Sequence, residues 1–136
     1  HRPAFEVVFL YLPEESRPGN DLGHVARQRA RLAQSMSEGC GIVRSAEGLS
    51  LARRTVAEIR SSLVRPALQV AELELINLLT VAEHMVVSAL AREESRGVHL
   101  RSDFPERDDA HWLRHVMLQA TRESDEPVVV LSEVED

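Results

Sequence analysis

The 136-residue chain contains one cysteine, Cys40, and its Phe, Trp and Tyr residues together make up only 4% of the sequence. A lone cysteine cannot form an internal disulfide, so we interpret the chain as cytoplasmic. Long apolar runs are also missing. The run AFEVVFLYL is interrupted by Glu6, is too short to span a bilayer and lacks a following cleavage site. The sequence therefore predicts no signal peptide, membrane anchor or membrane partner.

Positive charge is in deficit, with 16 Lys and Arg residues against 22 Asp and Glu residues and a net charge of -6. This balance repels phosphate backbones, so nucleic acid is not an expected partner. The hydrophobic content of 43% and the length of 136 residues suit one domain with a single core.

Residues 1–20 differ in pattern from the rest of the chain. FEVVFLYL has the composition of a strand or docked arm, and LPEESRPGND after it is rich in turn formers. Apolar residues at helical spacing then predict a first helix over Asp21–Ser37, capped by Asn20 or Asp21. Gly39 is expected to end that helix together with Gly41, because glycine adopts left-handed backbone angles freely.

Two further helices are predicted. Ser45 is a plausible cap for the second, and Pro66 suits the first turn of the third. The third helix is expected to span Pro66–Arg96, about 45 Å, with Gly97 as its left-handed cap. The apolar stripe of the second helix comprises Leu49, Ala52, Val56, Ile59 and Leu63. That of the third comprises Leu68, Ala71, Leu75, Leu78, Ala82, Met85 and Ala89, widened by Leu79, Val86 and Leu90.

The C-terminal region has shorter predicted elements. DDAHWL is expected to form one helical turn capped by Asp108 or Asp109. HVMLQAT and PVVVLSE have strand-like composition and predict a small hairpin over one end of the bundle. The alternative is a fourth amphipathic helix, built on Trp112, Leu113, Val116 and Met117.

These elements predict an all-α fold, a three-helix antiparallel bundle of the spectrin-repeat type. Residues 1–20 are its arm and loop, and residues 21–119 are the bundle. Residues 120–136 are an acidic tail that contributes one strand of the hairpin.

Motifs that carry chemistry are sparse. GCGIVRSAEG has the closely spaced Gly39 and Gly41 but follows a helical pattern, so a helix–helix turn is expected and not a phosphate loop. His111 and His115, four residues apart, resemble half of a zinc site, yet no second pair of ligands is evident. No nucleophile elbow of the G-x-S-x-G kind occurs. We therefore expect no catalytic residue, bound cofactor or metal in this chain.

The segment REESRGVHLRSDFPERDD, Arg92 to Asp109, is the densest mixed-charge stretch. Exposed ion pairs contribute only about 0 to 1 kcal/mol each, so a solvated run would do little for folding. Arginine presents a planar fork, so Arg96 and Arg101 could fix this backbone or hold a partner. Composition leaves open whether the segment satisfies its own helix terminus or is a docking edge. The docking candidates are Arg92, Glu94, Arg96, His99, Arg101 and Asp103, within residues 92–115.

The stretch ELELINLLTVAEHMVVSALAREESRGVHLRSDFPERDDAHWLRH, Glu72 to His115, resembles the C-terminal helical domain of the succinate dehydrogenase and fumarate reductase flavoproteins and L-aspartate oxidase. In that family a long helix ends in R-x-E-S-R-G-x-H-x-R-x-D-F-P-x-x-D-D-x-x-W-L-x-H. Gly41–Leu49, GIVRSAEGL, resembles the L-aspartate oxidases in particular. Ile76 departs from them, because they commonly carry arginine there. The resemblance covers roughly Arg31 to His115.

The resemblance implies a role. In the family, FAD and the substrate-binding residues belong to the domains that precede this bundle. A chain that begins at His1 without methionine is then expected to be the C-terminal accessory domain of an FAD-dependent enzyme that oxidises L-aspartate to iminoaspartate for NAD synthesis. Its partner would be the flavin-binding domain, docked against residues 92–115. Alternatives are the same domain of a respiratory flavoprotein, and a free-standing helical interaction module that pairs, with another copy or another protein, through the long helix.

Overall fold

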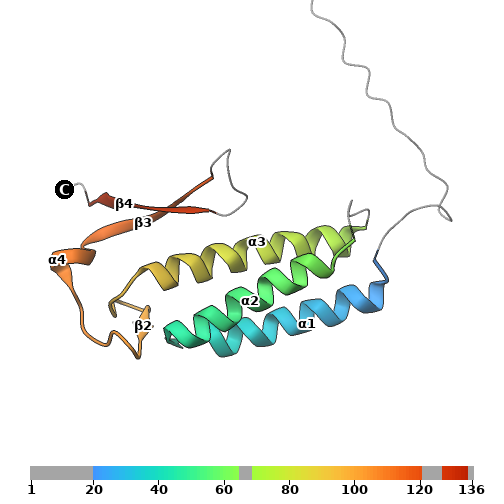
Figure 1. Cartoon of the computed structure of the whole chain (residues 1–136), viewed down its shortest axis with the longest axis horizontal. Helices are drawn as coiled ribbons and strands as arrows, with labels where there is room; N and C mark the ends of the chain where they lie inside the picture. Colours follow the sequence, from blue (N-terminus) through green and yellow to red (C-terminus); the bar gives the residue numbers. More distant parts are fainter. Residues whose placement is uncertain (1–19, 65–68, 121–126, 135–136) are drawn as a thin grey trace, which may run out of the picture.

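The computed structural model describes residues 20–64, 69–120 and 127–134, which fold into three long helices and a C-terminal hairpin (Figure 1). Asn20 is the first described residue, so the predicted arm at residues 1–19 lies outside this part of the chain. The elements in chain order are α1 (Leu22–Gly39), β1 (Val43–Arg44), α2 (Ala46–Ser62), α3 (Val70–Ala91), β2 (Leu100–Arg101), α4 (Asp109–Trp112), β3 (Arg114–Gln119) and β4 (Val128–Glu133).

The three long helices lie side by side in alternating directions, which confirms the predicted bundle (Figure 1). Two predicted N-caps are confirmed as well. The Asp21 carboxylate accepts a hydrogen bond from the His24 N–H at 2.9 Å, and the Ser45 hydroxyl accepts one from the Gly48 N–H at 3.1 Å. Side-chain oxygens thus satisfy N–H groups that the first helical turn leaves without partners.

The core lies between the three helices. The predicted stripe of α2 is fully confirmed, because all five of its residues are buried. On α3 the stripe is rotated: Leu79 and Val86 are completely buried, whereas Leu78 and Met85 are 40% and 47% exposed. The remaining buried hydrophobic residues of α1 and α3 are Val25, Leu32, Leu75, Ala82 and Ala89.

The first helix does not end as predicted. Neither Gly39 nor Gly41 has a positive φ, and Cys40, the C-cap, has φ -125°. Gly39 is needed for a different reason, which is the close crossing of α1 and α2. A Cβ at Gly39 would lie 2.4 Å from the Gly48 carbonyl oxygen. The glycine therefore allows two helix backbones to approach each other closely.

The third helix ends earlier than predicted, and the predicted Pro66 and Leu68 lie outside the described residues. It spans 22 residues, about 33 Å, and ends at Ala91, with Arg92 extended at φ -86° and ψ 106°. Gly97 does have a positive φ of 58°, but it lies in a separate turn. The predicted span to Arg96 was wrong because the spacing of apolar residues does not reveal which side chain donates hydrogen bonds to the last carbonyls of a helix.

The C-terminal hairpin is confirmed, and the alternative of a fourth helix is wrong. β3 and β4 pair antiparallel, with Val116 opposite Leu131 and Leu118 opposite Val129. The hairpin lies along α3 on the side away from α1 (Figure 1). The short predicted helix is also present as α4, with its N-cap at Asp108.

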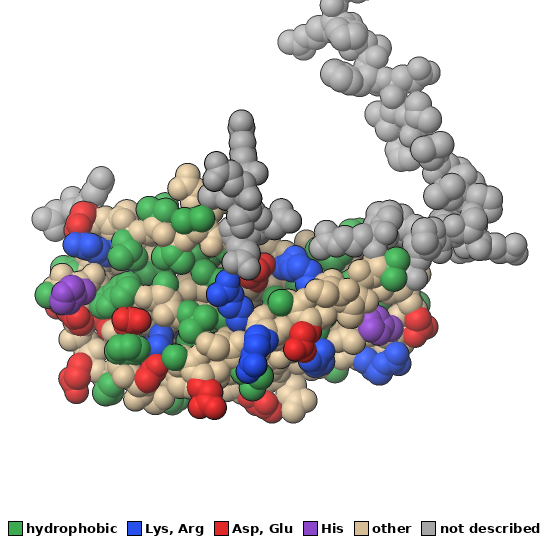
Figure 2. Space-filling model, viewed as in Figure 1, with side chains coloured by type: hydrophobic (Ala, Val, Ile, Leu, Met, Phe, Trp, Pro, Cys, Tyr) green, Lys and Arg blue, Asp and Glu red, His purple; other side chains and the backbone are tan. Residues whose placement is uncertain are grey.

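Apolar side chains remain on the surface of this assembly. On the face shown in Figure 2 they gather over the hairpin, where Met117 and Val128 are 53% and 45% exposed. Among the described residues, α3 is also the one helix whose length and composition, with a mean hydropathy of 1.5, would suffice to cross a membrane. In this fold it packs against α1, α2 and the hairpin instead.

Candidate functional site

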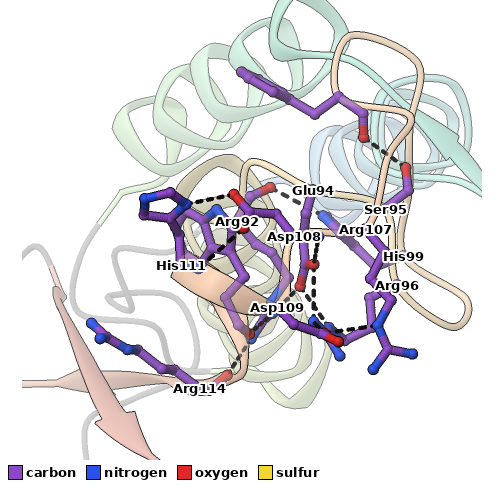
Figure 3. Close-up of polar contacts among 12 residues, drawn as sticks. Arg92, Glu94, Ser95, Arg96, His99, Arg107, Asp108, Asp109, His111 and Arg114 are labelled. Atoms are coloured by element: carbon purple, nitrogen blue, oxygen red, sulfur yellow. Dashed lines mark hydrogen bonds and ion pairs between the residues drawn. The ribbon is translucent and has the colours of Figure 1, made fainter.

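The candidate site is the polar segment that follows α3, residues 92–114, which we call the charged corner (Figure 3). It comprises an irregular loop, β2, α4 and the start of β3. All six predicted docking residues lie in it, and four are arginine or glutamate side chains that make several hydrogen bonds each. The corner is therefore an ordered network rather than a solvated run of charges.

Arg101 ends the long helix. The residue is 2% exposed. Its Nη1 donates to the carbonyl oxygens of Ala89 at 2.8 Å, Leu90 at 3.3 Å and Arg92 at 3.1 Å. The last carbonyls of a helix have no partner within the helix. A distant arginine supplies those donors here, and its positive charge also suits the negative end of the helix dipole.

Asp103 completes the Arg101 site and ties it to α2. Its two carboxylate oxygens accept hydrogen bonds from Nε and Nη2 of Arg101, both at 2.7 Å. The carboxylate also accepts the Ala46 N–H at 3.0 Å, at the start of α2. The hydrogen bonds from Arg101 hold the pKa of Asp103 well below its usual range. One ion pair thus joins the end of α3 to the beginning of α2.

Glu94 is the second buried centre of the corner and is 0% exposed. It accepts hydrogen bonds from Arg92 at 2.6 Å, Arg96 at 2.7 Å and the Asp108 N–H at 2.9 Å. Burial alone would raise the pKa of Glu94, but these donors outweigh it and lower the pKa to about 2. The carboxylate is therefore charged at neutral pH and organises two arginines.

Those two arginines connect Glu94 to the helix α4. Arg96 also pairs with Asp109, and the hydrogen bonds to Glu94 and Asp109 raise the Arg96 pKa. Arg92 donates to the carbonyl oxygens of Trp112 at 2.9 Å and Arg114 at 2.6 Å. Its guanidinium lies 5.6 Å from the centre of the Trp112 ring, in reach of a cation–π contact. The network fixes where β3 begins.

His99 links the corner to β1. Its Nδ1 lies 3.0 Å from Nη1 of Arg44, and its Nε2 lies 3.2 Å from the Arg92 carbonyl oxygen. A guanidinium can only donate, so Nδ1 accepts and Nε2 carries the proton, which makes the ring neutral. Burial lowers the His99 pKa, and repulsion from Arg44, Arg101 and Arg92 lowers it further.

The loop itself is closed by a tight turn. Arg96 and His99 exchange backbone hydrogen bonds of 2.8 and 2.9 Å around Gly97, whose positive φ of 58° suits glycine. Ser95 accepts the Arg101 N–H at 2.8 Å, and its hydroxyl lies 2.9 Å from the Phe104 carbonyl oxygen. These bonds set the register that places Arg101 under the helix end.

Every charged member of the predicted docking set has a partner within the chain. The reading of a helix terminus satisfied by its own charges is therefore confirmed for Arg101 and Asp103. These internal contacts do not test docking, which stays a prediction for the set as a whole.

His111 and His115, whose spacing resembles half of a zinc site, lie on different elements, α4 and β3. His111 pairs with Asp108 at 2.7 Å, while His115 lies on β3. Among the described residues no group of three His, Cys, Asp or Glu side chains could hold a metal ion.

Two contributors were missed by sequence reasoning. Arg44 was treated as part of a simple connection, although it contacts His99 at the corner. Asn20 was expected only as a cap, but it is 7% exposed and its backbone and side-chain nitrogens donate to the buried Glu72 at 2.6 and 2.8 Å. Its carboxamide also bonds both backbone groups of Val64. Neither contact follows from periodicity, because the partners are more than 40 residues apart.

The fold and the corner define a class: a compact helical domain whose long helix is closed by a buried arginine and whose polar end is rigidly organised. Residues 29–136 match the family described as Fumarate reductase flavoprotein C-term. The chain thus belongs to the succinate dehydrogenase and fumarate reductase flavoprotein family and corresponds to its C-terminal domain.

Individual relatives agree with this assignment. The chain is 37% identical over 103 residues to the succinate dehydrogenase flavoprotein subunit of Rickettsia bellii, which covers 68% of this chain and 17% of that protein. It is 35% identical over 122 residues to the fumarate reductase flavoprotein subunit of Mycobacterium tuberculosis, covering 82% and 21%. It is 38% identical over 99 residues to the L-aspartate oxidase of Streptomyces coelicolor, covering 67% and 17%. The chain therefore spans about a fifth of the length of these relatives.

Solved structures share the fold. A quinol-fumarate reductase with menaquinol molecules matches with a TM-score of 0.70 and 30% identity, covering 87% of this chain and 22% of that one. Mycobacterium smegmatis Sdh1 in complex with UQ1 matches with a TM-score of 0.68 and 25% identity, covering 83% and 21%. One of these structures is of a quinol enzyme and the other is of a complex with UQ1, so the absence of a membrane partner stays a prediction.

Proposed function

We propose that this chain is the C-terminal accessory domain of a cytoplasmic, FAD-dependent L-aspartate oxidase. In that reaction L-aspartate loses two electrons and two protons to become iminoaspartate, and the flavin is reduced. The domain itself would carry no reacting group. Its partner would be the flavin-binding domain of the same polypeptide.

One observation carries the proposal. The match to the Streptomyces coelicolor L-aspartate oxidase is 38% identical over 99 residues, a level at least equal to the 37% found with a succinate dehydrogenase subunit. The GIVRSAEGL segment that suggested this branch forms β1 and the start of α2. It supplies Arg44, which contacts His99, and Ala46, whose N–H binds Asp103. The segment therefore contacts the charged corner at two points.

The proposed work of the domain is mechanical. Arg101 and Glu94 are buried and hold the loop after α3 in one conformation, so its outward residues are pre-organised before any partner arrives. Ordering a flexible segment on binding costs about 0.5 to 1.5 kcal/mol per immobilised side chain. A preformed corner avoids that cost, so it suits a permanent contact between two parts of one enzyme.

The test uses the complete polypeptide that contains this chain. We expect it to purify with bound FAD and to oxidise L-aspartate faster than succinate. Arg96→Ala should weaken domain docking or flavin retention, because Arg96 links Glu94 to Asp109. Flavin content and the melting temperature measure this effect, and Arg54→Ala, at an exposed position of α2, is the control. Unchanged flavin content and melting temperature in Arg96→Ala would contradict the docking role.

A second candidate is the same domain in a succinate dehydrogenase or fumarate reductase flavoprotein. It is favoured by the names of the Rickettsia bellii and Mycobacterium tuberculosis relatives. The same assay separates the two candidates, because succinate oxidation or fumarate reduction without turnover of L-aspartate would reject the first and support the second.

A further inference from the structure

Two short loops meet at the charged corner and expose aliphatic side chains. β1 and β2 pair in parallel, with Val43 opposite Leu100 and Arg44 opposite Arg101. Paired residues of neighbouring strands share one face of the ribbon. The inner face therefore carries Arg44 and Arg101, and the outer face carries Val43 and Leu100.

This distribution is the reverse of the usual one, in which the apolar residues of a two-stranded ribbon face inward and the charged residues face solvent. Arg101 is 2% exposed, whereas Val43 is 62% and Leu100 is 40% exposed. The flanking residues continue the pattern, because Ile42 is 77% and Val98 is 88% exposed. We call Ile42, Val43, Val98 and Leu100 the apolar tip. Val98 follows Gly97 in the tight turn between Arg96 and His99.

We infer that the apolar tip, and not the charges beneath it, is the surface that docks on the flavin-binding part of the parent polypeptide, against an uncharged aliphatic patch there. This inference rests on the proposed function and deepens it. The charged residues are engaged inside the domain, so they act as the scaffold that fixes the tip. A charged partner surface would lose its hydration against these four side chains without gaining an ion pair.

The length of the relatives supports the flavin-binding part of the polypeptide as the partner that covers the apolar tip. The 103 matched residues are 17% of the Rickettsia bellii relative, which therefore has about 600 residues. The matched family region is its C-terminal part, so about 500 residues precede it. A compact body of that size has a radius of gyration of about 23 Å.

The distance between Asn20, where the chain enters the bundle, and the apolar tip is compatible with a partner of this size. Asn20 lies at the start of α1, whereas the tip lies beyond the end of that helix. α1 has 18 residues and a length of about 27 Å. A body about 60 Å across, as the radius of gyration implies, can begin near Asn20 and still cover the tip.

The test is cysteine labelling in the complete polypeptide. Val98→Cys and Ala57→Cys are made singly. Ala57 is an exposed residue in the middle of α2, away from the tip. Both thiols are treated with a maleimide, and the labelled peptides are identified by mass spectrometry, which separates them from other cysteines. Labelling in urea provides the fully accessible reference.

We expect Val98→Cys to react at least ten times more slowly than Ala57→Cys in the native enzyme and equally fast in urea. Equal rates in the native enzyme would overturn the inference. Flavin content and substrate oxidation of the unlabelled enzyme are measured in parallel. A polypeptide without flavin or oxidase activity would refute the proposed function instead, so the two failures are distinguishable.

Discussion

Removal of the Arg101 guanidinium should strongly destabilise the domain. Arg101→Met keeps most of the aliphatic volume but leaves the carbonyls of Ala89 and Leu90 without the Arg101 donor. Asp103 also loses its bidentate partner, whereas the Arg92 carbonyl keeps its hydrogen bond from His99. The Asp103 side chain is 30% exposed, so water can take over its pairing and the main cost lies in the carbonyls. Each shielded carbonyl left without a donor costs about 1 to 3 kcal/mol, or roughly 3 to 5 kcal/mol for the two. We expect that loss in the free energy of unfolding, against a total of about 5 to 15 kcal/mol for a typical domain.

The assay is urea unfolding of the 136-residue chain, followed by far-ultraviolet circular dichroism. With a urea dependence of about 1.5 kcal/mol per M, the midpoint should fall by about 2 to 3 M. Arg101→Lys should be only partly tolerated, because an ammonium cannot bind Asp103 through a planar fork. Hydrogen exchange should also rise first at the last turn of α3, since that turn loses its cap.

Arg107→Gln is the matched control for this experiment. Arg107 lies in the same segment but is 61% exposed and pairs with Asp109 at 2.8 Å. Such surface pairs contribute about 0 to 1 kcal/mol. If Arg101→Met and Arg107→Gln shifted the midpoint by the same small amount, the argument that Arg101 closes the helix would be wrong.

Three other predictions concern packing and pH. Gly39→Ala should destabilise the chain by about 1 to 3 kcal/mol through overpacking, whereas Gly48→Ala, whose nearest contact is 3.4 Å, should be tolerated; thermal unfolding compares them. The Glu94 carboxylate contributes its full stabilisation above pH 4.5, and this stabilisation is lost as pH falls toward 2. In Glu94→Gln the free energy of unfolding, measured in urea, should therefore depend less on pH over that range. Below the ordinary His99 pKa of 6.5, the unfolded chain binds more protons, so stability should decline toward pH 5 and His99→Gln should decline less.

Much of the bundle could be predicted from the sequence because its signals are local. Helical spacing of apolar residues found all three helices, and short polar residues marked the caps at Asp21, Ser45 and Asp108. The hairpin followed from strand-like composition on either side of a polar turn. Each of these signals operates within a few residues of the element that it describes.

The charged corner was only partly predictable because its contacts are not local in this sense. Charged residues are usually exposed, so composition gives no sign that Glu94 and Arg101 are buried. The end of α3 was misplaced for the same reason: its cap comes from Arg101, ten residues beyond Ala91. The rotation of the α3 stripe from Leu78 to Leu79 depends on where neighbouring helices lie, which periodicity alone does not specify.

The contacts of Asn20 have a consequence for motion in a larger assembly. Its side chain and backbone form hydrogen bonds with Glu72 on α3 and Val64 after α2. Since Asn20 also lies at the start of α1, it is connected to all three long helices. Because these contacts hold Asn20 to the bundle, a movement of Asn20 would move α1, α2 and α3 together. A displacement of Asn20 would therefore be transmitted along α1 to the opposite end of the domain.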